Sequence, residues 1–574
     1  MSLNERIKAA RGDRPVDLLL TNALIIDVFG KDIIEGQIAI YNGYIVGFGD
    51  YEAKDQLDLG GRFVAPGFID AHVHIESAMV GVTEFGRAVL LHGTTTIVAD
   101  PHEITNVFGT LGIDYMLQSA QSQPINVYYG LPSCVPATAM ESAGASLKAA
   151  DLAPYWTCKN VVALAEMMNF PGVIHEDPDV LAKIIAAKKA AKPLDGHAPG
   201  VMGKQLFAYL SAGIASDHEC TTLAEAKEKL RAGVHIMVRE GTCSRNLDAL
   251  FPLINSHTAR RMMWCTDDRH PHDLIYDGHI DAIVRKAVSK GLDPVTAIQM
   301  ATLNPAEYFR LDHIGAVAPG RQADLVVFSD LYRPVIEDVF YMGKQVVVDG
   351  KLLPNLKRPP LVECPTSMKL DRKQLNFSVQ AEGRHIRVID LISNQIITGQ
   401  SQLLTPIKDD KVVADPDQDL LKLAVIERHK GSNAMGLGFV RGFGLQKGAL
   451  ASSVAHDSHN IIVVGENDRD MLTAVTAVQQ MGGGLVVAVD ERITATVPLP
   501  IAGLMSKESV ATVQQQMDTL LKAAQRIGAT PGDPFMSLSF LALPVIPELK
   551  LTDQGLVDVN RFEVVPLFIS CFKH

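Results

Sequence analysis

The sequence has few of the features that mark secreted, membrane-bound and nucleic-acid-binding proteins. Its 574 residues include only seven cysteines, and no two of them form a CxxC pair, so no disulfide framework is expected. No run of 18 apolar residues occurs, which excludes a transmembrane helix of ordinary length. Acidic residues outnumber basic ones by 65 to 53. Neither a nucleic acid nor a membrane is therefore expected as a partner.

The remaining composition is typical of a globular protein that acts on a small molecule. Hydrophobic residues make up 47% of the chain and charged residues 21%. The length is sufficient for two or three domains. Residues 1–6 are polar and lack the apolar stretch of a signal peptide, so we expect a cytoplasmic location.

The chain alternates between β-rich and mixed segments. Short β-rich runs with turn signals fill residues 16–65, and similar runs return at residues 315–350. Between them, strand-like runs alternate with amphipathic segments roughly eight times over about 240 residues, the length of a (β/α)8 barrel. A doubly wound open sheet is the alternative, but its glycine fingerprint is missing. We predict an α/β fold with three parts: a TIM-like (β/α)8 barrel over residues 66–309, a flanking small β-sandwich domain from residues 1–65 and 310–360, and a C-terminal α/β domain over residues 365–574.

Six potential metal ligands fall where the predicted barrel strands end. His72 and His74 close the first strand, and side chains two apart on a strand point to the same face, so both can bind one ion. The carboxyl ends of barrel strands meet at one mouth. Donors at later strand ends should therefore converge on the same cavity. These donors are Glu166, His197, His218 and Asp267. Each of these residues alone has an ordinary explanation as a loop residue. Together they supply two pairs of imidazoles, one carboxylate to bridge two ions and one carboxylate to complete the ligand set.

Several motifs around these donors are shared with a known group of enzymes. They are PGFIDAHVH (66–74), HGTTT (92–96), TDD (266–268) and PGRQADL (319–325). On these motifs, residues 16–350 resemble the amidohydrolase superfamily of metal-dependent hydrolases. Further stretches resemble the bacterial adenine deaminase family over nearly the whole chain: TIVADPHE (96–103), EMMN (166–169), SDHE (216–219), VRGF (440–443) and AHDSHN (455–460).

This resemblance implies a reaction and a cofactor. The reaction is hydrolytic deamination of adenine to hypoxanthine and ammonia by a hydroxide that bridges two divalent metal ions. Two ions that share a water lower its pKa toward roughly 7. Glu166 would supply the bridge that many superfamily members make with a carbamylated lysine. Imidazole and carboxylate ligands suit Mn²⁺, Fe²⁺ or Zn²⁺, and we expect Mn²⁺ or Fe²⁺, with Zn²⁺ as the alternative.

The reaction also needs proton transfers to and from the substrate. Asp267 can take the proton from the water and pass it to the leaving amine. The ring must be protonated at N1, and Glu219 beside His218 is the first candidate donor, with Glu103 and Asp100 behind it. Other residues are expected to bind substrate or support the ligands: Asp100, His102, Asp268, Arg269, His456 and His459.

For some of these residues a second interpretation stays open. Asp100 and Asp268 either take part in the reaction or only hold ligand imidazoles and cap helices. Arg269 either touches substrate or lies in a solvated loop. His456 and His459 bracket an acid, and they could close the barrel mouth, hold an extra metal ion or lie in a polar turn.

Two other functions stay open beside adenine deamination. A cyclic-amide hydrolase related to dihydroorotases and hydantoinases would usually carry a lysine where this chain has Glu166. A non-catalytic scaffold on the same fold would be expected to have lost one or more of the six ligands. For the enzyme we expect adenine as the small-molecule partner and a homo-oligomer, either dimer or tetramer.

Overall fold

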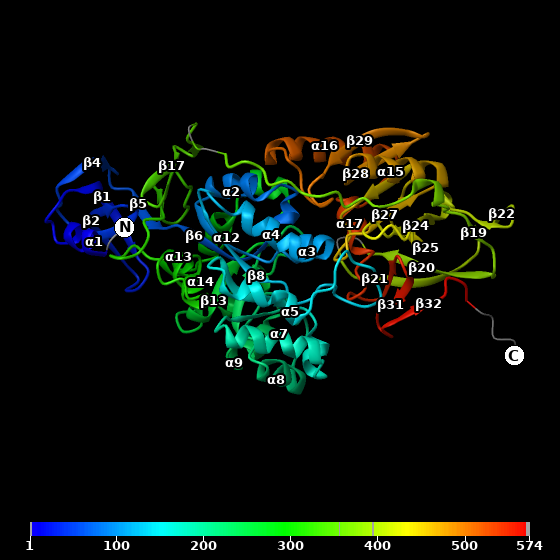
Figure 1. Cartoon of the computed structure of the whole chain (residues 1–574), viewed down its shortest axis with the longest axis horizontal. Coiled ribbons are helices and arrows are strands. Elements are labelled where there is room, and N and C mark those ends of the chain that lie inside the picture. Colours follow the sequence, from blue (N-terminus) through cyan, green and yellow to red (C-terminus); the bar gives the residue numbers. More distant parts are fainter. Residues whose placement is uncertain (1–2, 355, 357, 393–394, 570–574) are drawn as a thin grey trace.

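The chain folds into three parts that follow one another along its long axis (Figure 1). The computed structural model describes residues 3–354, 356, 358–392 and 395–569. A small β-domain lies at one end, the barrel in the middle and a β-rich C-terminal domain at the other end. The six cysteines in the described ranges are all free thiols. Within those ranges, no helix combines the length and hydropathy needed to cross a membrane.

The small β-domain is a nine-stranded sheet with strands from both sides of the barrel. Its strands are β1 (Val16–Asp27), β2 (Asp32–Tyr41), β3 (Tyr44–Phe48), β4 (Ala53–Asp58), β5 (Phe63–Pro66), β15 (Leu325–Phe328), β16 (Asp338–Tyr341), β17 (Lys344–Val348) and β18 (Lys351–Leu352). β5 pairs with β15 and joins the two groups. The sheet curls back on itself, so that β3 comes close to the segment before β15. There the Ile45 amide donates to the carbonyl oxygen of Arg321 (2.9 Å). Helix α1 (Leu3–Ala10) packs on β3.

The barrel has eight parallel strands, as the alternating pattern predicted. They are β6 (Phe68–His74), β7 (Thr94–Ala99), β8 (Asn126–Leu131), β9 (Val161–Met167), β10 (Leu194–Gly196), β11 (Ser216–Asp217), β12 (His235–Arg239) and an interrupted last strand, β13 (Met262–Cys265) with β14 (Asp267–Asp268). β14 pairs with β6 and closes the ring. Across the seam between β10 and β11, the Ala215 amide donates to Leu194 (2.9 Å). Helices cover the outside, so β6, β7 and β9 are buried along their whole length.

Local capping signals set the limits of the barrel helices. Helix α7 (Pro178–Lys189) begins where the Asp177 carboxylate accepts the amides of Asp179 and Val180, with proline in the first turn. Two lysines in its last turn complement the helix dipole. The remaining helices of this part are α2 (Val82–Leu90), α3 (His102–Phe108), α4 (Thr110–Ser119), α5 (Ala149–Leu152), α6 (Phe170–Ile174), α8 (Gly203–Ser211), α9 (Leu223–Arg231), α10 (Leu247–Leu250), α11 (Pro271–Tyr276), α12 (Ile280–Ser289), α13 (Pro294–Met300) and α14 (Leu303–Tyr308).

The C-terminal domain is built on an eight-stranded sheet in the order β21-β20-β25-β24-β27-β26-β28-β29. These strands are β20 (His385–Leu391), β21 (Thr398–Leu404), β24 (Leu421–Ile426), β25 (Met435–Arg441), β26 (Ala449–Ser452), β27 (Ile461–Gly465), β28 (Gly484–Val489) and β29 (Arg492–Pro498). Two small sheets complete the domain: β19 (Val379–Gln380) with β22 (Ile407–Lys408) and β23 (Lys411–Val412), and β30 (Leu549–Thr552) with β31 (Gly555–Asp558) and β32 (Glu563–Val565). Only β20 and β25 pair in parallel within the large sheet. The domain is thus mixed in content and β-rich.

Both faces of the large sheet are covered. Helix α15 (Asp468–Gln480) packs with the side chains of Ile461 and Val463. Ile462 and Val464 point the other way, into the core that includes helix α16 (Val510–Arg526) and continues into the barrel. This explains the unbroken apolar run in the sequence. Helix α16 contacts α11, and α17 (Pro534–Phe540) packs against β26 and β27, so the domain lies directly against the barrel (Figure 1).

Candidate metal centre

The six predicted ligands meet at the carboxyl ends of the barrel strands. β6 supplies two imidazoles, β9 supplies a carboxylate, and the other three ligands lie at the ends of β10, β11 and the last strand. Their donor atoms fall into overlapping groups within 4.8 Å: His72, His74 and Glu166; His72, His218 and Asp267; Glu166, His197 and His218. Five of the six are buried, and the His197 side chain is 24% exposed. Barrel geometry therefore brings the whole set to one place.

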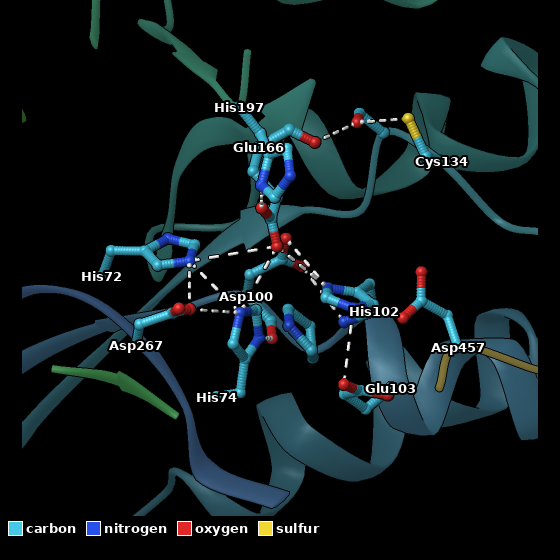
Figure 2. A network of polar contacts seen from close by, with 12 residues as sticks. His72, His74, Asp100, His102, Glu103, Cys134, Glu166, His197, Asp267 and Asp457 are labelled. Atoms are coloured by element: carbon cyan, nitrogen blue, oxygen red, sulfur yellow. Dashed lines mark hydrogen bonds and ion pairs between the residues drawn. The ribbon is translucent and has the colours of Figure 1, made fainter. Parts of the chain in front are cut away.

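Glu166 lies between His197 on one side and His72 and His74 on the other (Figure 2). Its Oε2 is 2.5 Å from Nδ1 of His197 and 3.2 Å from Nε2 of His218. Its Oε1 is 3.3 Å from Nε2 of His74 and 3.9 Å from Nε2 of His72. Each oxygen thus faces a different histidine pair. This is the arrangement that a bridging carboxylate needs.

Asp267 is held between two imidazoles and a buried arginine. Its Oδ1 is 3.1 Å from Nε2 of His74 and 3.4 Å from Nε2 of His72, and its Oδ2 accepts Nη1 of Arg239 at 2.7 Å. Arg239 also donates to both oxygens of Glu219, with Nη2 to Oε2 at 3.0 Å. Burial acts to raise the pKa of Asp267, but Arg239 and the histidines hold that pKa well below its usual value.

Arg239 was not among the predicted site residues. It is the last residue of β12, so its strand-end position was a usable signal. A guanidinium does not bind metal ions, so Arg239 was not expected among the ligands. Glu76, two residues beyond the first histidine pair, was also missed. Its carboxyl group is buried, and burial raises its pKa to about 7.

Hydrogen bonds to the backbone orient the ligands on β6. Nδ1 of His74 donates to the carbonyl oxygen of Asp100 (3.0 Å), which leaves Nε2 free to face the centre. Asp70 accepts the amides of His72 (3.2 Å) and Thr266 (3.1 Å). The first and last barrel strands are thereby fixed to each other. The same carboxylate lies 3.1 Å from Nε2 of His279.

The donor set fits divalent cations. Four imidazoles and two carboxylates meet in a buried site, which is costly without a compensating cation. Nδ1 of His102 lies 3.3 Å from Oδ2 of Asp100 and 3.5 Å from Oε1 of Glu166, so a further imidazole borders the same donor set. The chemistry of the donors matches a metal centre.

Two histidines of the C-terminal domain reach the barrel at Glu103. Nδ1 of His456 is 2.8 Å from Oε1 of Glu103, and Nε2 of His459 contacts Oε2. The Ala455 amide donates to Nδ1 of His459 (3.2 Å), so the proton of this neutral ring is on Nε2. His459 therefore donates to Glu103 and has no lone pair for a metal ion. The ring of Phe540 stacks on His456 at 4.9 Å.

The other predicted site residues divide into near and distant ones. Asp268 accepts Oγ of Ser77 (2.5 Å) and lies within reach of His74 and Asp267. Arg269 faces elsewhere: its guanidinium donates to the carbonyl oxygens of Gly278 (3.0 Å) and Glu240 (2.7 Å). It is buried and holds the chain after the last strand. The structure gives it no contact with the centre.

Two segments of the chain match the models of two known protein families. Residues 63–353 match the model of the amidohydrolase family, and residues 395–563 match that of the adenine deaminase C-terminal domain. An adenine deaminase of Desulfatibacillum aliphaticivorans is 53% identical over 562 residues, covering 98% of this chain and 99% of that one. Adenine deaminase 2 of Carboxydothermus hydrogenoformans is 46% identical over 569 residues, with the same coverage. Among solved structures, an adenosine deaminase from Xanthomonas campestris with bound Zn is 18% identical, covers 59% of this chain and 95% of its own, and has a TM-score of 0.45.

Proposed function

Because the chain belongs to the adenine deaminase family of amidohydrolases, we propose that it catalyses the hydrolytic deamination of adenine to hypoxanthine and ammonia. The observation that carries this proposal is the 53% identity with an adenine deaminase over nearly the whole length of both chains. The convergence of six metal-ligating side chains at the barrel mouth supports it independently.

We assign the six ligands to two divalent ions. His72, His74 and Asp267 would hold one ion, His197 and His218 would hold the other, and Glu166 would be a ligand shared by both. When bound, ions of this charge supply a water activated near neutral pH. The imidazole and carboxylate donors suit Mn²⁺, Fe²⁺ and Zn²⁺, with Mn²⁺ or Fe²⁺ expected first.

Carboxylates of the chain move the protons. One water adds at C6 of adenine, the bond from C6 to the amino nitrogen breaks, and ammonia leaves. Asp267 accepts one proton of the water at Oδ1 and returns it to the leaving amine. The second proton of the water leaves the C6 oxygen as the carbonyl forms and restores the acid that protonates N1. Glu219 is the proposed donor to N1, and Glu103 is the second candidate. Arg239 donates to Asp267 and to both oxygens of Glu219, which favours the ionised form of each carboxylate. Glu219 can therefore protonate N1 only after it has taken up a proton itself.

The C-terminal domain supports the same site. His456 and His459 come from the loop between β26 and β27 and hold the Glu103 carboxylate at the barrel mouth. Burial acts to raise the pKa of Glu103, and the two histidines hold it well below its usual value. Glu103 is therefore ionised and acts as an acceptor unless substrate displaces a histidine. We propose that His456 and His459 are positioning residues for Glu103.

Turnover of adenine by metal-replete protein tests the proposal. Adenine absorbance should fall while ammonia appears in equal amount. Absence of both with Mn²⁺, Fe²⁺ and Zn²⁺ would contradict it. Hydantoins and dihydroorotate serve as comparison substrates for a cyclic-amide hydrolase. That alternative is not favoured, because the relatives matched over the full length are adenine deaminases. A scaffold that had lost ligands is not favoured either, because all six are present.

The proposal includes an assembly and a location predicted from the sequence. We propose a homo-oligomer, dimer or tetramer, in the cytoplasm. Light scattering of the purified chain measures its oligomeric state directly. A mass equal to one chain would contradict it.

A further inference from the structure

A second cavity lies at the opposite end of the barrel from the metal centre. Its volume is about 450 Å³, within the range of small-molecule sites. Polar residues around it are Tyr128, Lys159, Asn160, Lys192, Arg310 and His313. Lys159 and Asn160 precede β9, and Lys192 precedes β10. At about 3.3 Å per strand residue, roughly 20 Å of β9 separates this cavity from Glu166.

The charge around the cavity is of one sign. Its lining includes two lysines, an arginine and a histidine but no acidic side chain. Within the described part of the chain, Lys159, Lys192 and Arg310 form no ion pair. Nζ of Lys192 donates to Val161 and Nη1 of Arg310 donates to Ala191, both at 2.6 Å to carbonyl oxygens. The cations are therefore anchored while their charges stay uncompensated.

This concentration of positive charge stands out in a chain whose net charge is −12. Burial and the nearby Arg310 lower the pKa of Lys192. The second cause means that two cations have been brought together without an anion between them. A bound anion would remove that repulsion, and an arginine beside lysines matches the geometry of a phosphate group.

The floor of the cavity is apolar. Val162, Phe309 and Leu311 line it and are buried. At one side, the hydroxyl of Tyr128 pairs with Nε2 of His313 at 2.9 Å. A ligand that fits would place a doubly charged head against the cations and a flat or apolar body on the floor. Inorganic phosphate alone would satisfy only the first part.

We propose that this cavity is a binding site for a small phosphate monoester, with the phosphate held by Lys159, Lys192 and Arg310 and the body of the ligand on Phe309 and Leu311. The site is separated from the metal centre by the barrel core, and its ligand is not the substrate of the reaction proposed above. The inference does not depend on that reaction.

Calorimetric titration of the full-length, metal-loaded protein tests the site. The probes are uridine 5′-monophosphate, inorganic phosphate and uridine; a pyrimidine is chosen because the proposed substrate is a purine. We expect saturable, one-to-one binding of the monophosphate, weaker binding of phosphate, and none of uridine. Raising NaCl from about 50 mM to about 200 mM should weaken binding of the monophosphate, since exposed charges are screened.

Variants locate the binding. Lys159→Glu combined with Arg310→Glu should weaken the monophosphate at least about tenfold. Lys344→Glu, at the exposed first residue of β17, changes the total charge without touching the cavity, and this variant should bind like the wild type. Melting curves check the fold, and Lys159→Ala at an exposed position serves if the double variant unfolds.

Three results would overturn the inference. One is the absence of saturable binding by both phosphate and the monophosphate. Another is uridine binding as tightly as the monophosphate. The third is equal affinity in the wild type and a folded cavity variant, which would place the anion elsewhere, including at the metal ions.

Discussion

Lys229 offers a direct test of how the barrel holds its second histidine pair. Its side chain is 1% exposed, and Nζ donates to Asp217 (2.5 Å), Glu225 (2.7 Å) and the carbonyl oxygen of Ala198 (2.6 Å). Asp217 precedes the ligand His218, and its Oδ1 accepts the amides of Ala198 and Glu219. One buried lysine therefore fixes the chain beside both ligands of the proposed second ion.

Lys229→Met keeps most of the side-chain volume and leaves two buried carboxylates without their cation. Breaking a buried pair in this way costs about 3–5 kcal/mol of the free energy of unfolding. For a barrel of about 240 residues, with an unfolding entropy near 0.5 kcal/mol/K, the melting temperature should fall by about 6–10 °C. Displacement of Asp217 should also weaken binding of the second metal ion about 10–100-fold.

The loss of stability caused by Lys229→Met should depend on pH in a defined direction. In the wild type, burial acts to raise the pKa of Asp217, but Lys229 holds it below the ordinary value of 3.8. A depressed folded-state pKa contributes stability above the unfolded pKa that is lost as pH falls through the folded one. In the variant, the unpaired carboxylate takes up a proton instead. The difference in free energy of unfolding between the wild type and Lys229→Met should therefore be largest near neutral pH. It should become smaller below about pH 4.

Calorimetry at pH 7 and at acidic pH measures both effects. Lys227→Met, exposed on the same helix, is the matched control and should melt like the wild type. A fall of less than about 2 °C at pH 7 for Lys229→Met, or a difference that does not change with pH, would refute the reasoning.

Three further substitutions test the roles assigned to single residues. His72→Asn should remove one metal ligand and lower turnover by more than about a hundredfold while the protein stays folded; retained activity would show that the ligand assignment is wrong. Glu219→Gln should keep both metal ions and lower turnover about a hundredfold if it is the donor to N1. An unchanged rate in Glu219→Gln, together with a slow Glu103→Gln, would move that role to Glu103. His459→Phe removes one hydrogen-bond donor to Glu103 and should lower kcat about tenfold with metal content unchanged. A wild-type kcat in His459→Phe would leave the C-terminal loop without a positioning role.

The sequence was sufficient to predict that the six proposed ligands converge, because parallel barrel strands constrain where their side chains can lie. Once residues 66–309 are treated as alternating strands and helices, side chains at the carboxyl ends must share one mouth. Arg239 obeys the same rule and could have been found by it. Lys229 could not, since a lysine on helix α9, with Lys227 close by, is usually part of a solvated face.

Contacts between domains could not be predicted from the sequence. Glu103 and His459 are 356 residues apart, and no local pattern indicates that they touch. The strand order of the C-terminal sheet could not be predicted either: β26 lies between β27 and β28, which is not the order of these strands along the chain. Periodicity identifies strands, whereas their order depends on packing against α15 and α16.

Metal titration of the apoprotein tests the central claim most directly. Protein stripped by a chelator should have no adenine turnover. Activity should then rise with added Mn²⁺ or Fe²⁺ and reach a plateau at two ions per chain, with hypoxanthine and ammonia formed in equal amounts. Full activity without metal, or no turnover of adenine at two equivalents of Mn²⁺, Fe²⁺ or Zn²⁺, would contradict the account.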